Sequence, residues 1–197
     1  MKDNKINRAT GPKIRATGFK PVALSKFTRR NLPHWEKAGA TYFITFNTKR
    51  IELSEAERRL VMQTCLHWQD LKWRVHQLLV MPDHVHLLAT PLPIRATDNR
   101  ATGLKPVALF YSLSEILHSV KRYSAREINQ RRGRQGTLWW DESYDMMVNT
   151  EEEFRQKWDY IRNNPVKKGL ARRAEQYAFY WEEETKGHRF STGEPQV

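Results

Sequence analysis

The chain has 197 residues, which is the usual size of one domain with a proper hydrophobic core. Its net charge of +12 indicates a polyanionic partner, most often nucleic acid, and its single cysteine, Cys65, excludes an internal disulfide and a cysteine-based zinc site. Because no apolar run approaches the length of a transmembrane helix and no signal-peptide-like segment opens the chain, we expect a cytoplasmic protein with no membrane partner.

The charge is concentrated at the start of the chain. Residues 1–30 hold nine Lys or Arg and one acidic residue, whereas the remainder holds 25 basic and 21 acidic residues. We therefore expect residues 1–32 to form a basic arm that is disordered until it binds a partner. This arm contains the decapeptide RATGFKPVAL at 15–24, which returns as RATGLKPVAL at 100–109.

The two decapeptides match at nine of ten positions but do not form a repeat architecture, because globular sequence separates them. Partial copies precede both, which favours an in-frame insertion of a dispersed genomic repeat. The alternative is a flexible basic linker of no significance. In either case residues 94–109 are predicted to be a loop insert in the domain.

The first half of the domain predicts a strand, a helix and a hairpin. Residues 41–48 alternate large apolar and polar side chains, as a strand does. Ser54 and Glu57 form a predicted capping box for a helix whose Leu60, Val61, Thr64 and Trp68 follow at helical spacing. The strand-like runs 74–81 and 84–90 meet at Pro82-Asp83, a favourable pair for a tight turn.

The second half predicts a helix, a strand and another helix. Ser112 and Glu115 offer a second capping box, before a helix with an apolar face and an opposite basic face. The apolar face comprises Leu113, Ile116, Leu117, Val120, Ser124 and Ile128. Residues 137–148 are predicted to be a strand and residues 151–164 a helix that Pro165 ends or redirects.

The element order indicates an α+β fold, a ferredoxin-like antiparallel sheet with helices on one face. The domain is predicted to span residues 33–170, and residues 171–197 to form a C-terminal extension.

His84 and His86 are separated by one residue on a predicted strand, so both imidazoles lie on the same face. Two such histidines can chelate one divalent cation. From spacing alone, two ordinary surface histidines would be the simpler interpretation. The alternate residues Val85, Leu87 and Ala89 are predicted to lie in the core. Their packing should hold the strand rigidly enough to support a metal site.

Tyr160 and Asn164 lie four residues apart on the last predicted helix and therefore share a face. A tyrosine can act as a covalent nucleophile, but a free tyrosine hydroxyl has a pKa near 10 and needs a nearby metal or cation. The amide of Asn164 could supply an oxygen ligand. Alternatively, Tyr160 is a core residue and Asn164 caps a short helix that begins at Pro165.

Three blocks of the chain together resemble a known family. MPDHVHLL (81–88), GTLWWDESYD (136–145) and DYIRNNPVKKGL (159–170) look like the signature blocks of the REP-associated tyrosine transposases, which belong to the single-tyrosine HUH superfamily. The resemblance extends from about residue 42 to residue 170. It implies that His84 and His86 hold Mg²⁺ or Mn²⁺ and that Tyr160 is the catalytic tyrosine. Asn164 stands where related enzymes carry a glutamine that supplies a third metal ligand.

The resemblance also implies a reaction and a partner. The reaction is transesterification of single-stranded or hairpin DNA through a 5′-phosphotyrosyl intermediate, at palindromic repeats and without ATP. The DNA that encodes the decapeptide would then belong to a repeat family on which such an enzyme acts. Whether the protein is a monomer or a homodimer stays open, since related enzymes can share sites across a dimer.

Other interpretations remain. Tyr123, on the basic helix, and Tyr144 are rival nucleophiles without an amide four residues on. A domesticated DNA-binding protein would keep the fold without the reaction, and a metal-dependent phosphohydrolase would not need Tyr160. Basic side chains would bind phosphates, and aromatic ones, Tyr144 included, would stack on unpaired bases. The predicted DNA-binding residues are Lys121, Arg122, Tyr123, Arg126, Arg131, Arg132, Trp139 and Trp140.

Overall fold

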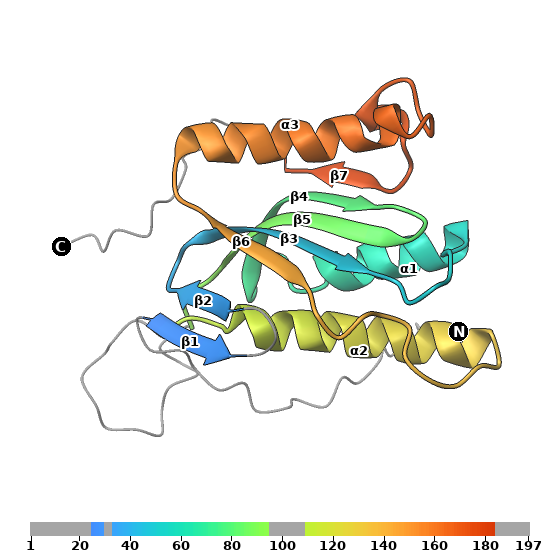
Figure 1. The fold of residues 1–197 in the computed structure, drawn as a ribbon, viewed down its shortest axis with the longest axis horizontal. Coiled ribbons are helices and arrows are strands. Elements are labelled where there is room, and N and C mark those ends of the chain that lie inside the picture. The colour runs from blue at the N-terminus through green and yellow to red at the C-terminus, as the bar shows by residue number, and fades with distance from the viewer. Residues whose placement is uncertain (1–24, 30–32, 95–108, 184–197) are drawn as a thin grey trace, which may run out of the picture.

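The computed structural model describes residues 25–29, 33–94 and 109–183 of the chain (Figure 1). A five-stranded antiparallel sheet in the order β6-β3-β5-β4-β7 forms its centre, and β1 pairs with β2 in a separate two-stranded sheet. The strands are β1 (Ser25–Arg29), β2 (Pro33–Lys37), β3 (Thr41–Asn47), β4 (Trp73–Val80), β5 (His84–Pro91), β6 (Tyr144–Val148) and β7 (Tyr180–Glu182). The helices are α1 (Glu55–Leu66), α2 (Leu113–Arg131), α3 (Glu151–Lys167) and the short 3-10 turn η2 (Ala174–Gln176).

The succession β3-α1-β4-β5-α2-β6 confirms the predicted α+β fold with an antiparallel, ferredoxin-like sheet. The two core helices, α1 and α2, lie on one face of the sheet as predicted (Figure 1). The third predicted helix, α3, lies on the opposite face. It can pack there because that face is also partly apolar, with Phe43 and Leu88 buried on it.

Successive side chains along each strand point to opposite faces of the sheet, so the strands contribute buried side chains to both layers. On β5, Val85, Leu87 and Ala89 are fully buried and face α1 and α2, as predicted for core positions. Their neighbours on β3 across this face are Ile44 and Phe46, also fully buried. Burial of each of the Val, Leu, Ile and Phe side chains among them stabilises the fold by about 1.5–3 kcal/mol. The predicted turn at Pro82-Asp83 joins β4 to β5, with the amide of Met81 donating to the carbonyl of His84 at 2.8 Å.

The two predicted capping boxes have different outcomes. At α1, Ser54 and Glu57 form the complete box, with both reciprocal hydrogen bonds. At α2, Ser112 makes no side-chain capping bond to the helix backbone; its hydroxyl lies 2.8 Å from that of Ser114 instead. The apolar face predicted for α2 is nevertheless buried in full.

Two predicted boundaries near the end of the domain are wrong. The strand predicted over 137–148 begins only at Tyr144, because the carbonyls of Trp140 and Asp141 accept hydrogen bonds from the ammonium group of Lys121, at 2.6 and 2.9 Å, instead of pairing with a neighbouring strand. Helix α3 does not end at Pro165; it continues to Lys167. Pro165 lies in the last turn of α3, where the backbone hydrogen bond that a proline cannot donate costs the helix least stability.

The end of α3 is a Schellman motif. Gly169, with φ +68°, donates to the carbonyl of Val166, and Leu170 donates to the carbonyl of Pro165, both at 2.9 Å. The chain then returns through η2 and adds β7 to the free side of β4. The folded domain therefore extends beyond residue 170, where the sequence placed its end.

The two repeat-bearing segments lie largely outside the described residues. Of the predicted arm, residues 25–29 form β1, and residues 1–24 are not described. Of the predicted insert, the ends are described: the amide of Ile94 donates to the carbonyl of Leu109 at 2.6 Å, and Pro93 pairs with Phe110 in an isolated bridge. The insert thus leaves and re-enters the domain at one closed neck, formed by Pro93, Ile94, Leu109 and Phe110.

Within the described part of the chain, no helix combines the length and the apolar character needed to cross a membrane.

Candidate active site

The two histidines of the sequence motif lie on β5, the central strand of the sheet, between β3 and β4. Their rings point to the α3 face of the sheet, with centroids 4.6 Å apart. Val85 between them is fully buried on the other face. Since β5 is hydrogen-bonded on both sides, the backbone that carries the two rings is held rigidly.

Each histidine has its Nδ1 atom held by a neighbouring oxygen. His84 donates from Nδ1 to the carboxylate of Asp83, with the two atoms 2.6 Å apart. His86 has Nδ1 2.8 Å from the hydroxyl of Thr45, which lies directly opposite on β3. Such contacts fix the tautomer and orientation of a histidine and leave Nε2 as the atom that can bind a metal.

Asn164 comes to the same site from α3. Its side-chain amide nitrogen donates to Nε2 of His86 at 3.1 Å, so the proton of His86 lies on Nδ1 and is donated to Thr45. Burial, and to a smaller extent the nearby His84, lower the pKa of His86 to about 3, although Asp83 opposes the shift. The neutral ring that results is the form of histidine that ligates metals.

Tyr160 lies one turn before Asn164 on α3, as its spacing predicts. Its ring meets that of His86 edge to face, with centroids 5.3 Å apart, and packs in the same way on Phe43 at 5.7 Å. The residue is still 45% exposed. Two aromatic contacts therefore orient the ring beside the histidines, while solvent can reach the residue.

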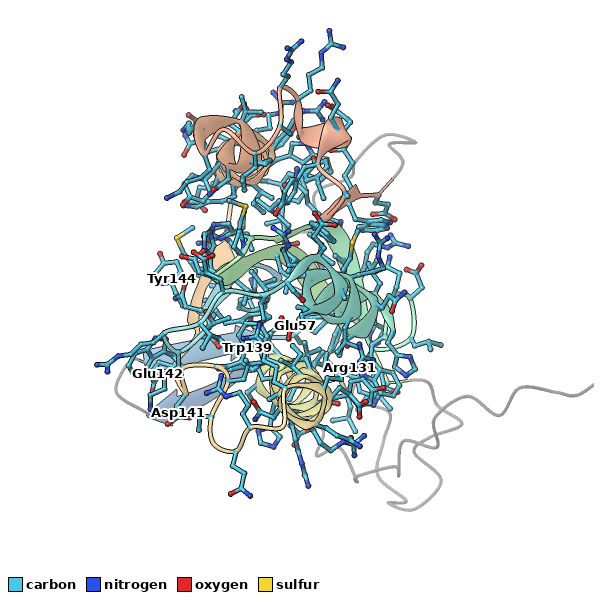
Figure 2. The ribbon with its side chains drawn as sticks, turned by 90° about the vertical axis from the view of Figure 1, so that its right-hand side faces the viewer. Glu57, Arg131, Trp139, Asp141, Glu142 and Tyr144 are labelled. Carbon is cyan, nitrogen blue, oxygen red and sulfur yellow. The ribbon has the colours of Figure 1, made fainter. Side chains whose placement is uncertain are left out.

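The rival tyrosines occupy different places. Tyr123 lies on α2, and the sheet separates that helix from the histidines (Figures 1 and 2). Tyr144 lies on β6 opposite Thr45, on the same sheet face as His86, and its ring is 6.2 Å from that of Phe43. Tyr144 is also 51% exposed, so it is the tyrosine that competes with Tyr160 on geometry.

Of the two tryptophans predicted to contact DNA, one is buried in the core and the other is exposed. Trp139 is only 4% exposed: it packs edge to face on Phe46, and its indole N–H donates to the hydroxyl of Ser124 at 3.0 Å. Stacking of Trp139 on unpaired bases was therefore a wrong prediction. Trp140 is 45% exposed, with the ammonium group of Lys49 5.0 Å from its ring centroid. It keeps a free surface on which a base could stack.

The basic residues predicted on α2 also fall into two groups. Some bind other residues of the fold, and others have no partner among the described residues. Arg132 binds the carboxylate of Glu57 on α1 with two guanidinium nitrogens, one of them at 2.5 Å, and Lys121 binds carbonyls of the 140–141 segment. Both side chains join parts of the fold to each other. Arg126 pairs with its neighbour Glu127 at 2.8 Å. Arg122 and Arg131 are exposed, and the described residues provide no partner for either.

Sequence reasoning missed the residues that support the site. Thr45, Asp83 and Phe43 touch His86, His84 and Tyr160, respectively. The sequence pattern identifies Asp83 only as a turn residue. The register that puts Thr45 beside His86 is a tertiary property, and no local pattern could have revealed it.

The possible metal-donor atoms at the site are two imidazole nitrogens and the side-chain oxygen of Asn164, whose amide nitrogen, not its oxygen, faces His86 in the structure. Among the described residues there is no group of three His, Cys, Asp or Glu side chains that could hold a metal ion. A metal centre here would therefore depend on Asn164 as the third protein ligand. Two imidazoles with one oxygen donor suit a first-row transition ion better than Mg²⁺, which prefers oxygen ligands.

The fold described above is shared with a protein of known structure. The structure of a REP-associated tyrosine transposase bound to a REP hairpin matches with a TM-score of 0.55 and 18% sequence identity. The match covers 86% of this chain and 99% of that one. A putative transposase from Deinococcus radiodurans has 19% identity and a TM-score of 0.39, covering 68% of this chain and 94% of its own. No family model and no curated protein sequence matches the chain.

Proposed function

We propose that the protein is a metal-dependent single-stranded DNA transesterase, a transposase of the REP-associated tyrosine type. One observation carries the proposal: Tyr160 and Asn164 of α3 meet His86 of β5 across the packed face of the sheet. A structural role alone would not need an exposed tyrosine, two oriented histidines and an amide to converge. The fold shared with a REP-associated transposase supports the same proposal.

Tyr160 is the proposed nucleophile. Its phenolate oxygen forms a bond to the phosphorus of the scissile phosphate, and the bond from phosphorus to the 3′ oxygen breaks. The leaving oxygen takes up a proton and becomes a 3′-OH, while the 5′ end stays joined to the tyrosine. A second 3′-OH can attack the phosphotyrosine and join new ends. The energy of the broken bond is kept in the protein linkage, so no nucleotide is consumed.

His84, His86 and Asn164 are the proposed holders of a divalent ion, Mn²⁺ or Mg²⁺. When bound, the ion polarises the scissile phosphate and offsets negative charge in the transition state. Thr45 and Asp83 hold the two imidazoles in the ligating orientation through their Nδ1 atoms. Phe43 supports the Tyr160 ring, and the residue's exposure leaves room for a DNA strand to reach it.

The proposed substrate is DNA that is single-stranded or folded as a hairpin at a palindromic repeat. The structural neighbour was bound to a REP hairpin, and the net charge of +12 suits a polyanion. The link between the decapeptide repeats and this substrate stays a prediction, because both copies lie almost entirely outside the described residues.

The test is incubation with an end-labelled hairpin DNA carrying a single-stranded tail, with Mn²⁺ or EDTA, followed by a denaturing gel. We expect a covalent protein–DNA adduct that forms only with metal. Metal-dependent cleavage without an adduct would indicate a phosphohydrolase. Binding without cleavage or adduct would indicate a DNA-binding protein that has lost the reaction.

A further inference from the structure

The side of the sheet on which the site lies restricts where DNA can run. Tyr160 and His86 lie between the sheet and α3, whereas α2 covers the opposite face (Figures 1 and 2). A strand whose phosphate reaches Tyr160 must therefore lie against α3. The basic face of α2, which the sequence favoured for DNA contact, is separated from that phosphate by the whole sheet.

Helix α3 carries its own cations on the flank of the nucleophile. Lys157, Tyr160, Asn164 and Lys168 follow at spacings of three, four and four residues, so they form one stripe along the helix. The ammonium group of Lys157 is 5.0 Å from the centroid of Phe43, the same ring that packs on Tyr160. From Lys157 to Lys168 the helix rises by about 16 Å, which is long enough for several phosphates of a strand.

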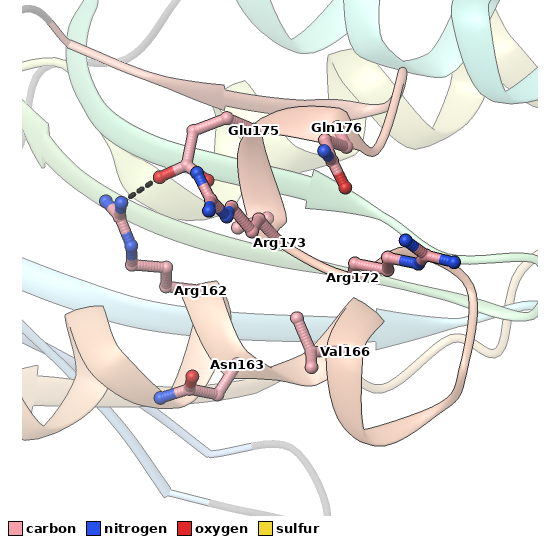
Figure 3. Close-up of a pocket in the computed structure, with 8 residues that line it drawn as sticks. Arg162, Asn163, Val166, Arg172, Arg173, Glu175 and Gln176 are labelled. Atoms are coloured by element: carbon pink, nitrogen blue, oxygen red, sulfur yellow. Dashed lines mark hydrogen bonds and ion pairs between the residues drawn. The ribbon is translucent and has the colours of Figure 1, made fainter.

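The positive surface continues beyond the end of α3. An open pocket of about 550 Å³ lies between the outer side of the helix and the 172–176 segment, with Arg172 and Arg173 in its lining (Figure 3). Arg162, also in the lining, is neutralised by Glu175 and by Glu182, the latter at 3.1 Å. The charges that remain available at this end of the helix are therefore those of Arg172 and Arg173, beside Lys167 and Lys168.

These four cations are exposed, and no described residue forms an ion pair with any of them. The helix dipole explains part of the pattern, because basic residues stabilise the last turn and α3 also has three glutamates in its first turn. It does not explain Lys157 in the middle of the helix, nor Arg172 and Arg173 outside it. Asp159, beside Tyr160, is an exposed acid whose position falls outside the 157-160-164-168 spacing of the stripe.

We infer that the α3 side of the molecule, through Lys157, Lys167, Lys168, Arg172 and Arg173, holds the backbone phosphates of the DNA on both sides of the scissile phosphate. This basic surface of α3 rests on the proposed function for its ligand. Lys157 contacts the strand close to Tyr160, and the other four residues contact it beyond Asn164. Such contacts position the strand and carry no base specificity.

The test compares two double variants that each remove two exposed charges without described partners. Lys167→Ala/Lys168→Ala changes the basic surface of α3, and Arg122→Ala/Arg131→Ala changes α2. Both are made in a Tyr160→Phe background, and binding of a fluorescein-labelled hairpin with a single-stranded tail is followed by anisotropy from 50 to 200 mM salt. Thermal melting confirms that both variants fold.

We expect the α3 variant to lose about tenfold in affinity and its log–log salt slope to fall by about 1.4, since each single-strand phosphate contact contributes about 0.7. The α2 variant should lose less than about threefold. An equal or larger loss in the α2 variant, or an unchanged slope in the α3 variant, would overturn the inference. The adduct assay on the unmodified chain is independent: its failure would refute the reaction and leave the binding comparison intact.

Discussion

Asn164 and His86 lie 78 residues apart in the sequence, yet the amide nitrogen of one is 3.1 Å from Nε2 of the other. This contact crosses from α3 to β5, the strand at the centre of the sheet. It depends on α3 packing through Phe154, Ile161 and Pro165, its buried residues. The contact between Asn164 and His86 therefore forms only when α3 packs on this face of the sheet.

The first prediction concerns the nucleophile. Tyr160→Phe should abolish the covalent adduct and leave DNA binding nearly unchanged, because only one hydroxyl is removed and the ring contacts with His86 and Phe43 remain. The denaturing gel measures the adduct, and anisotropy measures binding. Tyr144→Phe and Tyr123→Phe are the matched controls and should both retain the adduct. An adduct that survives in Tyr160→Phe and disappears in Tyr144→Phe would move the nucleophile to β6.

The second prediction concerns the orientation of His86. Thr45→Val removes the hydroxyl partner of Nδ1 while keeping the side-chain shape, so Mn²⁺ affinity and adduct rate should fall by about 10- to 100-fold. Electron paramagnetic resonance measures manganese binding directly, so the loss of metal affinity is detected independently of the adduct assay.

Thr41→Val on the same strand is the control for Thr45→Val. It breaks a buried hydroxyl contact with Thr90, 2.7 Å long, and should lower stability by about 1–3 kcal/mol without weakening manganese binding. Equal losses of metal affinity in the two variants would show that Thr45 acts only through stability.

The third prediction concerns the metal. Because two of the three proposed donors are imidazole nitrogens, Mn²⁺ should support adduct formation at lower concentration than Mg²⁺, by about tenfold or more. EDTA should abolish the adduct, and added Mn²⁺ should restore it. His84→Ala and His86→Ala should each cost at least about tenfold in rate. Full activity of the double histidine variant in EDTA would refute the metal site.

The fourth prediction concerns pH and stability. The hydrogen bond from Arg132 holds the pKa of Glu57 at about 2, below its ordinary value of 4.5. A carboxyl whose pKa is lowered by folding stabilises the native state above the unfolded pKa and loses that contribution as pH falls. Glu57→Gln should therefore reduce the free energy of unfolding by roughly 2–3 kcal/mol at pH 7, and the difference should shrink between about pH 4.5 and pH 2.

Glu55→Gln is the control for this change, since it removes an exposed acid from the same first turn of α1. It should cost less than about 1 kcal/mol at any pH. Urea unfolding at several pH values measures both variants. A pH-independent difference between Glu57→Gln and the unmodified chain would contradict the ion-pair explanation.

The fifth prediction concerns the insert. Replacing residues 95–108 by an Asn-Gly turn should leave the melting temperature and the adduct unchanged, because the neck already brings Ile94 and Leu109 into hydrogen-bond contact at 2.6 Å. Thermal melting and the gel assay check the two parts. If the adduct is lost while the melting temperature is retained, the insert takes part in the reaction.

Local patterns predicted much of this fold. The capping box at Ser54, the apolar face of α2 and the turn at Pro82-Asp83 all depend on neighbours within one element, and the structure confirms each. The prediction that Tyr160 and Asn164 share a face is also confirmed, because it depends only on the geometry of a single helix.

The errors arise where tertiary contacts outweigh local preference. Trp139 looks like a strand aromatic, but its indole is held in the core by Ser124 of α2. Lys121 looks like a phosphate ligand on the basic face, but it binds backbone carbonyls of a distant loop. Pro165 looks like a helix end, but α3 continues for two residues beyond it and ends in the Schellman motif that follows.

The closed neck also bears on how the gene can change. Beyond the hydrogen bond between Ile94 and Leu109, each doubling of loop length adds only about 0.6 kcal/mol of closure entropy. Whole in-frame units of a genomic repeat could therefore be gained or lost at this position with little selection from folding. In evolutionary terms the neck is a tolerant insertion point, and the length of the coding sequence there can record the history of the surrounding DNA rather than the requirements of the folded protein.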